Sequence, residues 1–100
     1  MLNAMEETKK MPLVSVIMPA YKCSVLLRES AASVQAQTMP DWELLIVDDC
    51  SPDDTYDTAR SLASQDPRIR AFQTPGNAGP GEARNIALSH ARGKYAAFLD

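Results

Sequence analysis

The chain is poor in the residues that build metal centres and disulfide frameworks. Its 100 residues include two cysteines, Cys23 and Cys50, and one histidine, His90, so no zinc-binding spacing is present. We interpret both cysteines as free thiols in a reducing compartment, with a single disulfide as the alternative. The lone histidine also leaves no Ser–His–Asp or Cys–His nucleophile set that the sequence could specify.

Positive charge is scarce as well. Ten Lys and Arg residues stand against 13 Asp and Glu residues, which gives a net charge of −3. A chain of this kind lacks the broad positive field of a nucleic-acid-binding protein, so nucleic acid is not an expected partner. A small anionic ligand remains compatible, because backbone N–H groups and one or two arginines can hold a phosphate.

Long apolar runs are absent too. Residues 1–12 form a polar leader without the apolar stretch of a signal peptide or membrane span, and we expect a cytoplasmic protein. Any membrane association would come from sequence outside these residues. The chain is 45% hydrophobic and 23% charged, which is ordinary for a globular protein and predicts one domain over residues 13–100.

Short apolar runs alternate with helical patterns along this domain. Strands are predicted at residues 14–18, where Pro19 stops the run, and at 44–47, 69–73 and 95–99. The first helix has Ser24 as its cap, the second has Ser51 as its cap with Pro52 at the first helical position, and the third follows a glycine-rich loop. The alternation predicts an α/β fold in which helices cover a parallel sheet.

Ligands of open parallel sheets bind beyond the carboxyl ends of the strands. In this sequence those positions are Pro19-Ala20-Tyr21, Asp48-Asp49, the loop 74–81 and Asp100. The paired acids have two interpretations: they cap the next helix, or they bind a sugar hydroxyl, a base N–H or a metal ion. If Ser51 is the cap, at least one carboxylate is left for binding.

The glycine-rich loop 74–81 precedes a helix that carries Arg84. Its N–H groups and this arginine could hold a phosphate. The spacing matches neither G-x-G-x-x-G nor a Walker loop, so a simple turn with a solvated Arg84 is the alternative. Tyr21 has a similar pair of interpretations, stacking on a planar base or ordinary packing.

Taken together, five blocks resemble the family 2 glycosyltransferases of the GT-A fold. They are VSVIMPAY at 14–21, SVQAQT at 33–38, WELLIVDDCSPD at 42–53, NAGPGEARN at 77–85 and GKYAAFLD at 93–100. The resemblance implies a three-layer α/β/α fold with a mostly parallel sheet. It also implies a nucleotide-sugar donor such as a UDP-sugar, whose base and ribose are held around Pro19, Ala20 and Tyr21 and by Asp49.

The resemblance further places Gly79 and Arg84 near the nucleotide. Asp100 is similar to the first acid of the family's Asp-x-Asp motif, which binds the diphosphate through Mg²⁺ or Mn²⁺. Such an ion would neutralise charge on the leaving nucleotide diphosphate. The parent enzyme is then expected to be inverting and to use a saccharide, lipid-linked or other hydroxyl acceptor.

Two departures from the family pattern stand out. Lys22 occupies a position where the family usually has asparagine. The sequence also stops at Asp100, before the rest of the metal motif, the acceptor site and the catalytic base. We therefore expect these 100 residues alone to be inactive in transfer and their last strand to promote self-association through an exposed edge.

Two other functions fit parts of the pattern. One is a non-catalytic module that binds nucleotide sugars or a partner protein. The other is a receiver-like signalling domain, which also has an acidic pair after a strand. That domain needs an aspartate at a later strand end, whereas the predicted third strand ends at Gln73-Thr74.

Overall fold

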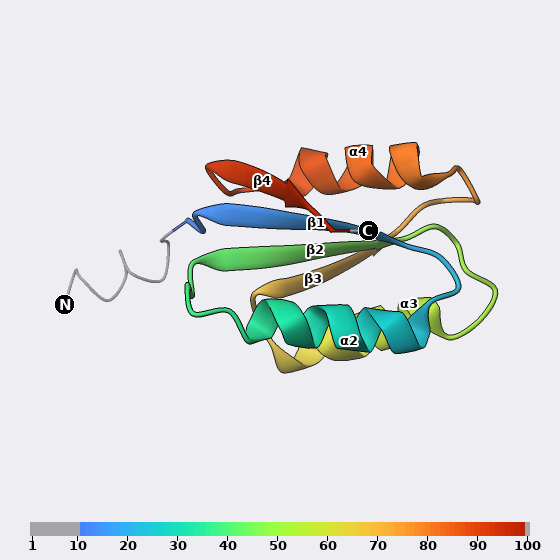
Figure 1. Cartoon of the computed structure of the whole chain (residues 1–100). Helices are drawn as coiled ribbons and strands as arrows, with labels where there is room; N and C mark the ends of the chain where they lie inside the picture. Colours follow the sequence, from blue (N-terminus) through green and yellow to red (C-terminus); the bar gives the residue numbers. More distant parts are fainter. Residues whose placement is uncertain (1–10, 100) are drawn as a thin grey trace.

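The computed structural model describes residues 11–99, in which strands and helices alternate (Figure 1). The elements are β1 (Val14–Ala20), α2 (Ser24–Gln35), β2 (Trp42–Asp48), α3 (Thr55–Gln65), β3 (Ile69–Gln73), α4 (Pro80–His90) and β4 (Tyr95–Phe98). The strands pair in the order β3-β2-β1-β4, and all neighbouring pairs are parallel. The predicted α/β class with a parallel sheet is confirmed.

The sheet lies between two helical layers. Helices α2 and α3 cover one face, and α4 covers the other (Figure 1). Leu27, Ala31 and Val34 of α2 are buried against the sheet, as their spacing predicts. Every residue of β2 is buried, which explains why its sequence is a continuous apolar run over residues 44–47. Each buried leucine or valine of this core contributes about 1.5–3 kcal/mol.

Strand β1 continues through Pro19 instead of stopping before it, so that predicted boundary is wrong. Ile17 O accepts a hydrogen bond from Leu99 N on the β4 side, and Ala20 O accepts one from Asp49 N on the β2 side. This alternation turns the nitrogen of Pro19 toward the β4 side. The pairing with β4 ends at Ile17, so no ladder bond is lost where the proline lacks its N–H group.

Two predicted helix boundaries, the starts at Ser24 and at Ser51, are also wrong in detail. Helix α3 begins at Thr55, four residues after Ser51, and α2 begins at Ser24 itself with Cys23 as its cap residue. Neither cap residue makes a side-chain capping bond. Ser51 instead donates its hydroxyl to Asp48, three residues earlier, so a bond within the turn after β2 takes the group that the sequence pattern assigns to the helix.

Strand β4 forms one edge of the sheet and has all four residues exposed. It ends one residue before the predicted boundary. Among residues 11–99, no helix combines the length and the apolar character needed to cross a bilayer.

Candidate functional site

A pocket of about 460 Å³ lies at the carboxyl ends of β1 and β2. Its walls are formed by Pro19, Ala20, Tyr21, Asp49, Asn77, Gly79, Pro80 and Arg84. All six residues in the described range that the family resemblance implicates are among them. They come from four separate parts of the chain, and the fold brings them together.

Backbone hydrogen bonds fix these strand ends to one another. Asp49 N donates to Ala20 O at 2.8 Å, and Thr74 N donates to Asp48 O at 2.9 Å. The first bond joins the end of β1 to the residue after β2, and the second joins β2 to the start of the glycine-rich loop. The pocket floor is therefore a continuation of the sheet, whereas the wall at residues 77–80 depends on the loop.

The carboxylate of Asp49 holds that loop. Its Oδ1 accepts hydrogen bonds from Ala78 N at 2.8 Å and from the Thr74 hydroxyl at 2.9 Å, and its Oδ2 accepts one from Gly79 N at 2.8 Å. The carboxylate lies just before the first turn of α4, where a negative charge is favoured by the helix dipole. The Asp49 carboxylate therefore stabilises the conformation of the glycine-rich loop.

These bonds also affect ionisation. The N–H of Ala78, and then the N–H of Gly79 and the hydroxyl of Thr74, lower the pKa of Asp49 below the ordinary aspartate value, and burial opposes them only in part. Asp49 is thus a carboxylate at neutral pH. The N–H groups of Ala78 and Gly79 are already used, so these two donors are not free for a phosphate.

Asp48 has a purely structural environment. It is fully buried and accepts hydrogen bonds from Ser51 N at 3.0 Å, the Ser51 hydroxyl and Gln73 Nε2 at 3.1 Å. The Ser51 oxygen in turn accepts a bond from Lys22 N at 3.0 Å. Asp48 therefore stabilises the turn after β2 and its contact with the turn after β1, and only Asp49 of the acidic pair borders the pocket.

The turn after β1 presents Tyr21 and Lys22. Tyr21 lines the pocket and is 43% exposed, and the ammonium group of Lys22 lies 5.4 Å from the centre of its ring. Lys22 has a φ of 50°, in the left-handed region that disfavours most side chains but tolerates asparagine. The structure thus gives a physical reason for the family's usual asparagine: that position requires a left-handed backbone.

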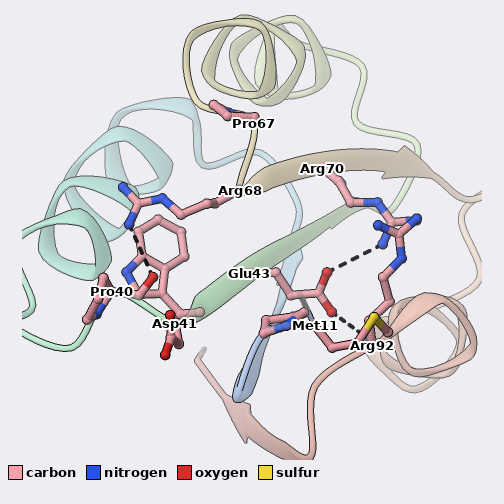
Figure 2. Close-up of a pocket in the computed structure, with 10 residues that line it drawn as sticks. Met11, Pro40, Asp41, Glu43, Pro67, Arg68, Arg70 and Arg92 are labelled. Carbon is pink, nitrogen blue, oxygen red and sulfur yellow. Dashed lines mark hydrogen bonds and ion pairs between the residues drawn. The ribbon is translucent and has the colours of Figure 1, made fainter. Parts of the chain in front are cut away.

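A second pocket of about 330 Å³ lies at the other end of the strands, near the start of β2 (Figure 2). The carboxylate of Glu43 lies between Arg70 and the backbone of Arg92 in this view. Glu43 is buried and accepts bonds from the Ser15 hydroxyl at 2.7 Å, Arg92 N at 2.7 Å and Arg70 at 3.4 Å. These charges are paired within the protein, which indicates a structural network joining the strands to the loop after α4.

No group of three or more His, Cys, Asp or Glu side chains within residues 11–99 is arranged to hold a metal ion. Asp100, the predicted metal ligand, lies outside the described residues. Cys23 and Cys50 are free thiols, as predicted, and burial raises the pKa of Cys23.

Sequence reasoning did not single out three residues of this region. Asn77 and Pro80 line the pocket, and Thr74 binds Asp49 from a buried position. Asn77 and Pro80 belong to the fourth of the five sequence blocks, so that block contained the signal. Thr74 is the first residue of the loop 74–81, which the strand-end rule does mark, but nothing in the sequence distinguishes it from the other residues of that loop.

The chain is similar in sequence and in fold to known proteins. Residues 15–100 match the sequence model described as Glycosyl transferase family 2. A Bacillus subtilis (strain 168) protein, provisionally named as the teichuronic acid biosynthesis glycosyltransferase TuaG, is 45% identical over 89 residues, which are 89% of this chain and 35% of TuaG. The chain thus spans about a third of the length of that relative.

Two solved structures have the same fold. The S. aureus TarS fragment 1–349 in complex with UDP-GlcNAc is 34% identical with a TM-score of 0.78, over 88% of this chain and 26% of that one. The mannosyltransferase PcManGT from Pyrobaculum calidifontis, in complex with GDP-Man and Mn²⁺, is 28% identical with a TM-score of 0.72, over 90% of this chain and 30% of that one. The expected three-layer arrangement of the GT-A type is confirmed.

Proposed function

Because the chain belongs to glycosyl transferase family 2, we propose that it holds the nucleotide part of a nucleotide-sugar donor, a UDP-sugar in the first place. The whole protein would transfer the sugar with inversion to an acceptor hydroxyl on a saccharide, a lipid-linked sugar or another molecule. We also propose that this donor pocket works in the cytoplasm. The role proposed for this chain itself is to bind and orient the donor.

The pocket at the carboxyl edge of the sheet carries this proposal. It combines a half-exposed aromatic ring at Tyr21, apolar walls at Pro19 and Pro80, an ionised carboxylate at Asp49 and the arginine Arg84. A planar base needs an apolar or aromatic surface and a few polar partners, and a diphosphate needs positive charge. One relative of the same fold has been solved with UDP-GlcNAc, which supports the choice of UDP.

The proposal is tested by titrating UDP into the chain and measuring heat of binding. Tyr21 is the best residue to change, because it lines the pocket and is exposed, so its loss leaves the core intact. We expect Tyr21→Ala to weaken UDP binding about tenfold or more, as for other bases stacked on aromatic rings. Tyr95→Ala is the matched control, because Tyr95 is 57% exposed on β4 and lies outside the pocket. Equal UDP affinities of the two variants would refute the proposal.

We further propose Asp100 as a ligand for Mg²⁺ or Mn²⁺. The PcManGT complex contains Mn²⁺, which supports a divalent ion in this family. The described residues offer no metal cluster of their own, so the test must address Asp100 directly. UDP binding should strengthen with added Mn²⁺ in the unchanged chain, and Asp100→Asn should remove that gain. A gain that survives the substitution would assign the ion to other ligands.

A further inference from the structure

Thr74 is buried between the carboxylate of Asp49 and the backbone carbonyl of Gly76 in the glycine-rich loop. Its side-chain oxygen lies 2.9 Å from Asp49 Oδ1 and 2.6 Å from the carbonyl oxygen of Gly76. Thr74 is only 2% exposed, and its own N–H donates to Asp48 O at 2.9 Å. The residue is therefore fixed to the end of β2 through its backbone and to the loop through its hydroxyl.

The hydroxyl has one proton, and both neighbours are acceptors, so the two contacts share a single donor. Asp49 also receives the N–H groups of Ala78 and Gly79. The carboxylate thus collects three donors, two of which belong to the loop wall that borders the pocket. If the Thr74 hydroxyl is lost, its one donated proton is lost to the buried Asp49 carboxylate and the part-buried Gly76 carbonyl that share it, and a buried acceptor left without a donor is costly.

We infer that Thr74 is a positioning residue for the nucleotide pocket. Its hydroxyl orients the Asp49 carboxylate and the Gly76 carbonyl, and through them it sets the loop at residues 76–79. It does not line the pocket, so it acts through Asp49 and the loop and not by touching the ligand. The inference rests on the proposed nucleotide binding for its functional consequence, whereas the ordering of the loop is independent of it.

Two substitutions separate the hydroxyl from the rest of the side chain. Thr74→Val keeps the shape and the branching at Cβ but removes the hydroxyl. Thr74→Ser keeps the hydroxyl and is the matched control. We expect Thr74→Val to bind UDP about tenfold more weakly, which corresponds to one lost hydrogen bond to a charged group, and Thr74→Ser to stay close to the unchanged chain.

Hydrogen exchange of individual amides supplies a readout that does not depend on the ligand. The amides of Ala78 and Gly79 should exchange about tenfold faster in Thr74→Val, because local opening becomes easier, while amides of the buried strand β2 such as Ile46 keep their protection. Thr74→Ser should restore slow exchange at both loop amides.

The outcomes distinguish this inference from the proposed function. Unchanged exchange at Ala78 and Gly79 in Thr74→Val would overturn the positioning role, even if UDP affinity fell, because the loss would then have another origin. Faster loop exchange together with weaker UDP binding would support it. If the unchanged chain failed to bind UDP, the proposed function would fail, and the exchange rates would still decide whether Thr74 orders the loop.

Discussion

Replacing Gly93 by alanine should destabilise the fold through a steric clash with β1. A Cβ atom at this position would lie 2.6 Å from Ser15 N, 2.7 Å from Ser15 Oγ and 2.9 Å from the carbonyl carbon of Val14. The backbone of β1 cannot give way as a flexible side chain would, because it is the central strand between β2 and β4. The loop after α4 must therefore move away.

That movement breaks a buried network. Gly93 N donates to Ser15 Oγ at 2.8 Å, and Ser15 donates to Glu43 at 2.7 Å. Overpacking costs about 1–3 kcal/mol, and a lost hydrogen bond adds about 1 kcal/mol. Alanine also restricts the unfolded chain, which offsets about 0.4–1 kcal/mol. We expect the free energy of unfolding to fall by about 1–3.5 kcal/mol in total.

Urea unfolding monitored by fluorescence measures this change directly, because Trp42 is the single tryptophan and is buried. Gly76→Ala is the matched control: nothing lies within 4 Å of its added Cβ, and its φ is not in the left-handed region. It should leave stability unchanged or raise it by up to about 1 kcal/mol. A Gly93→Ala variant within about 0.5 kcal/mol of the unchanged chain would refute the clash.

Three further expectations concern backbone strain, pH and association. Lys22→Asn should raise the free energy of unfolding by about 1 kcal/mol, because asparagine tolerates the left-handed backbone; a decrease in urea unfolding would contradict this. Hydrogen bonds from Arg68, opposed in part by burial, lower the pKa of Asp66, so this carboxylate stabilises the fold above about pH 4 and that contribution is lost as pH falls below it. The free energy of unfolding should therefore fall less between pH 6 and pH 3 in Asp66→Asn than in the unchanged chain. An equal fall in both proteins would exclude the effect. The chain should self-associate at high concentration in light scattering through the exposed edge strand β4, and Phe98→Lys should reduce the association; a monomer at all concentrations would refute it.

The sheet and its helical layers were predictable because their signals are local. Continuous apolar runs mark strands buried on both faces, and β3 has the predicted bounds Ile69–Gln73. The pocket residues were predictable for a similar reason. They lie at strand ends and in sequence blocks of a known family, so their places follow from the order of the elements.

Hydrogen bonds between residues far apart in the sequence were not predictable. Ser51 is predicted to cap the second helix, but its hydroxyl donates to Asp48 and its oxygen accepts a bond from the N–H of Lys22, 29 residues away, while α3 begins only at Thr55. Glu43 lies just outside the predicted strand 44–47, yet it is buried and accepts bonds from Ser15, Arg70 and the N–H of Arg92, which lie 27 to 49 residues away. Such contacts exist only after the chain has folded, and local patterns do not contain them.

We propose that a nucleotide binds in the pocket at the carboxyl ends of the strands and not in the pocket of Figure 2 near their amino ends. Amide and indole NMR signals recorded during titration with UDP test it most directly. We expect shifts at Ala20, Tyr21, Gly79 and Arg84, with no change at the Trp42 indole or the Arg92 amide. Shifts confined to Trp42 and Arg92 would contradict it.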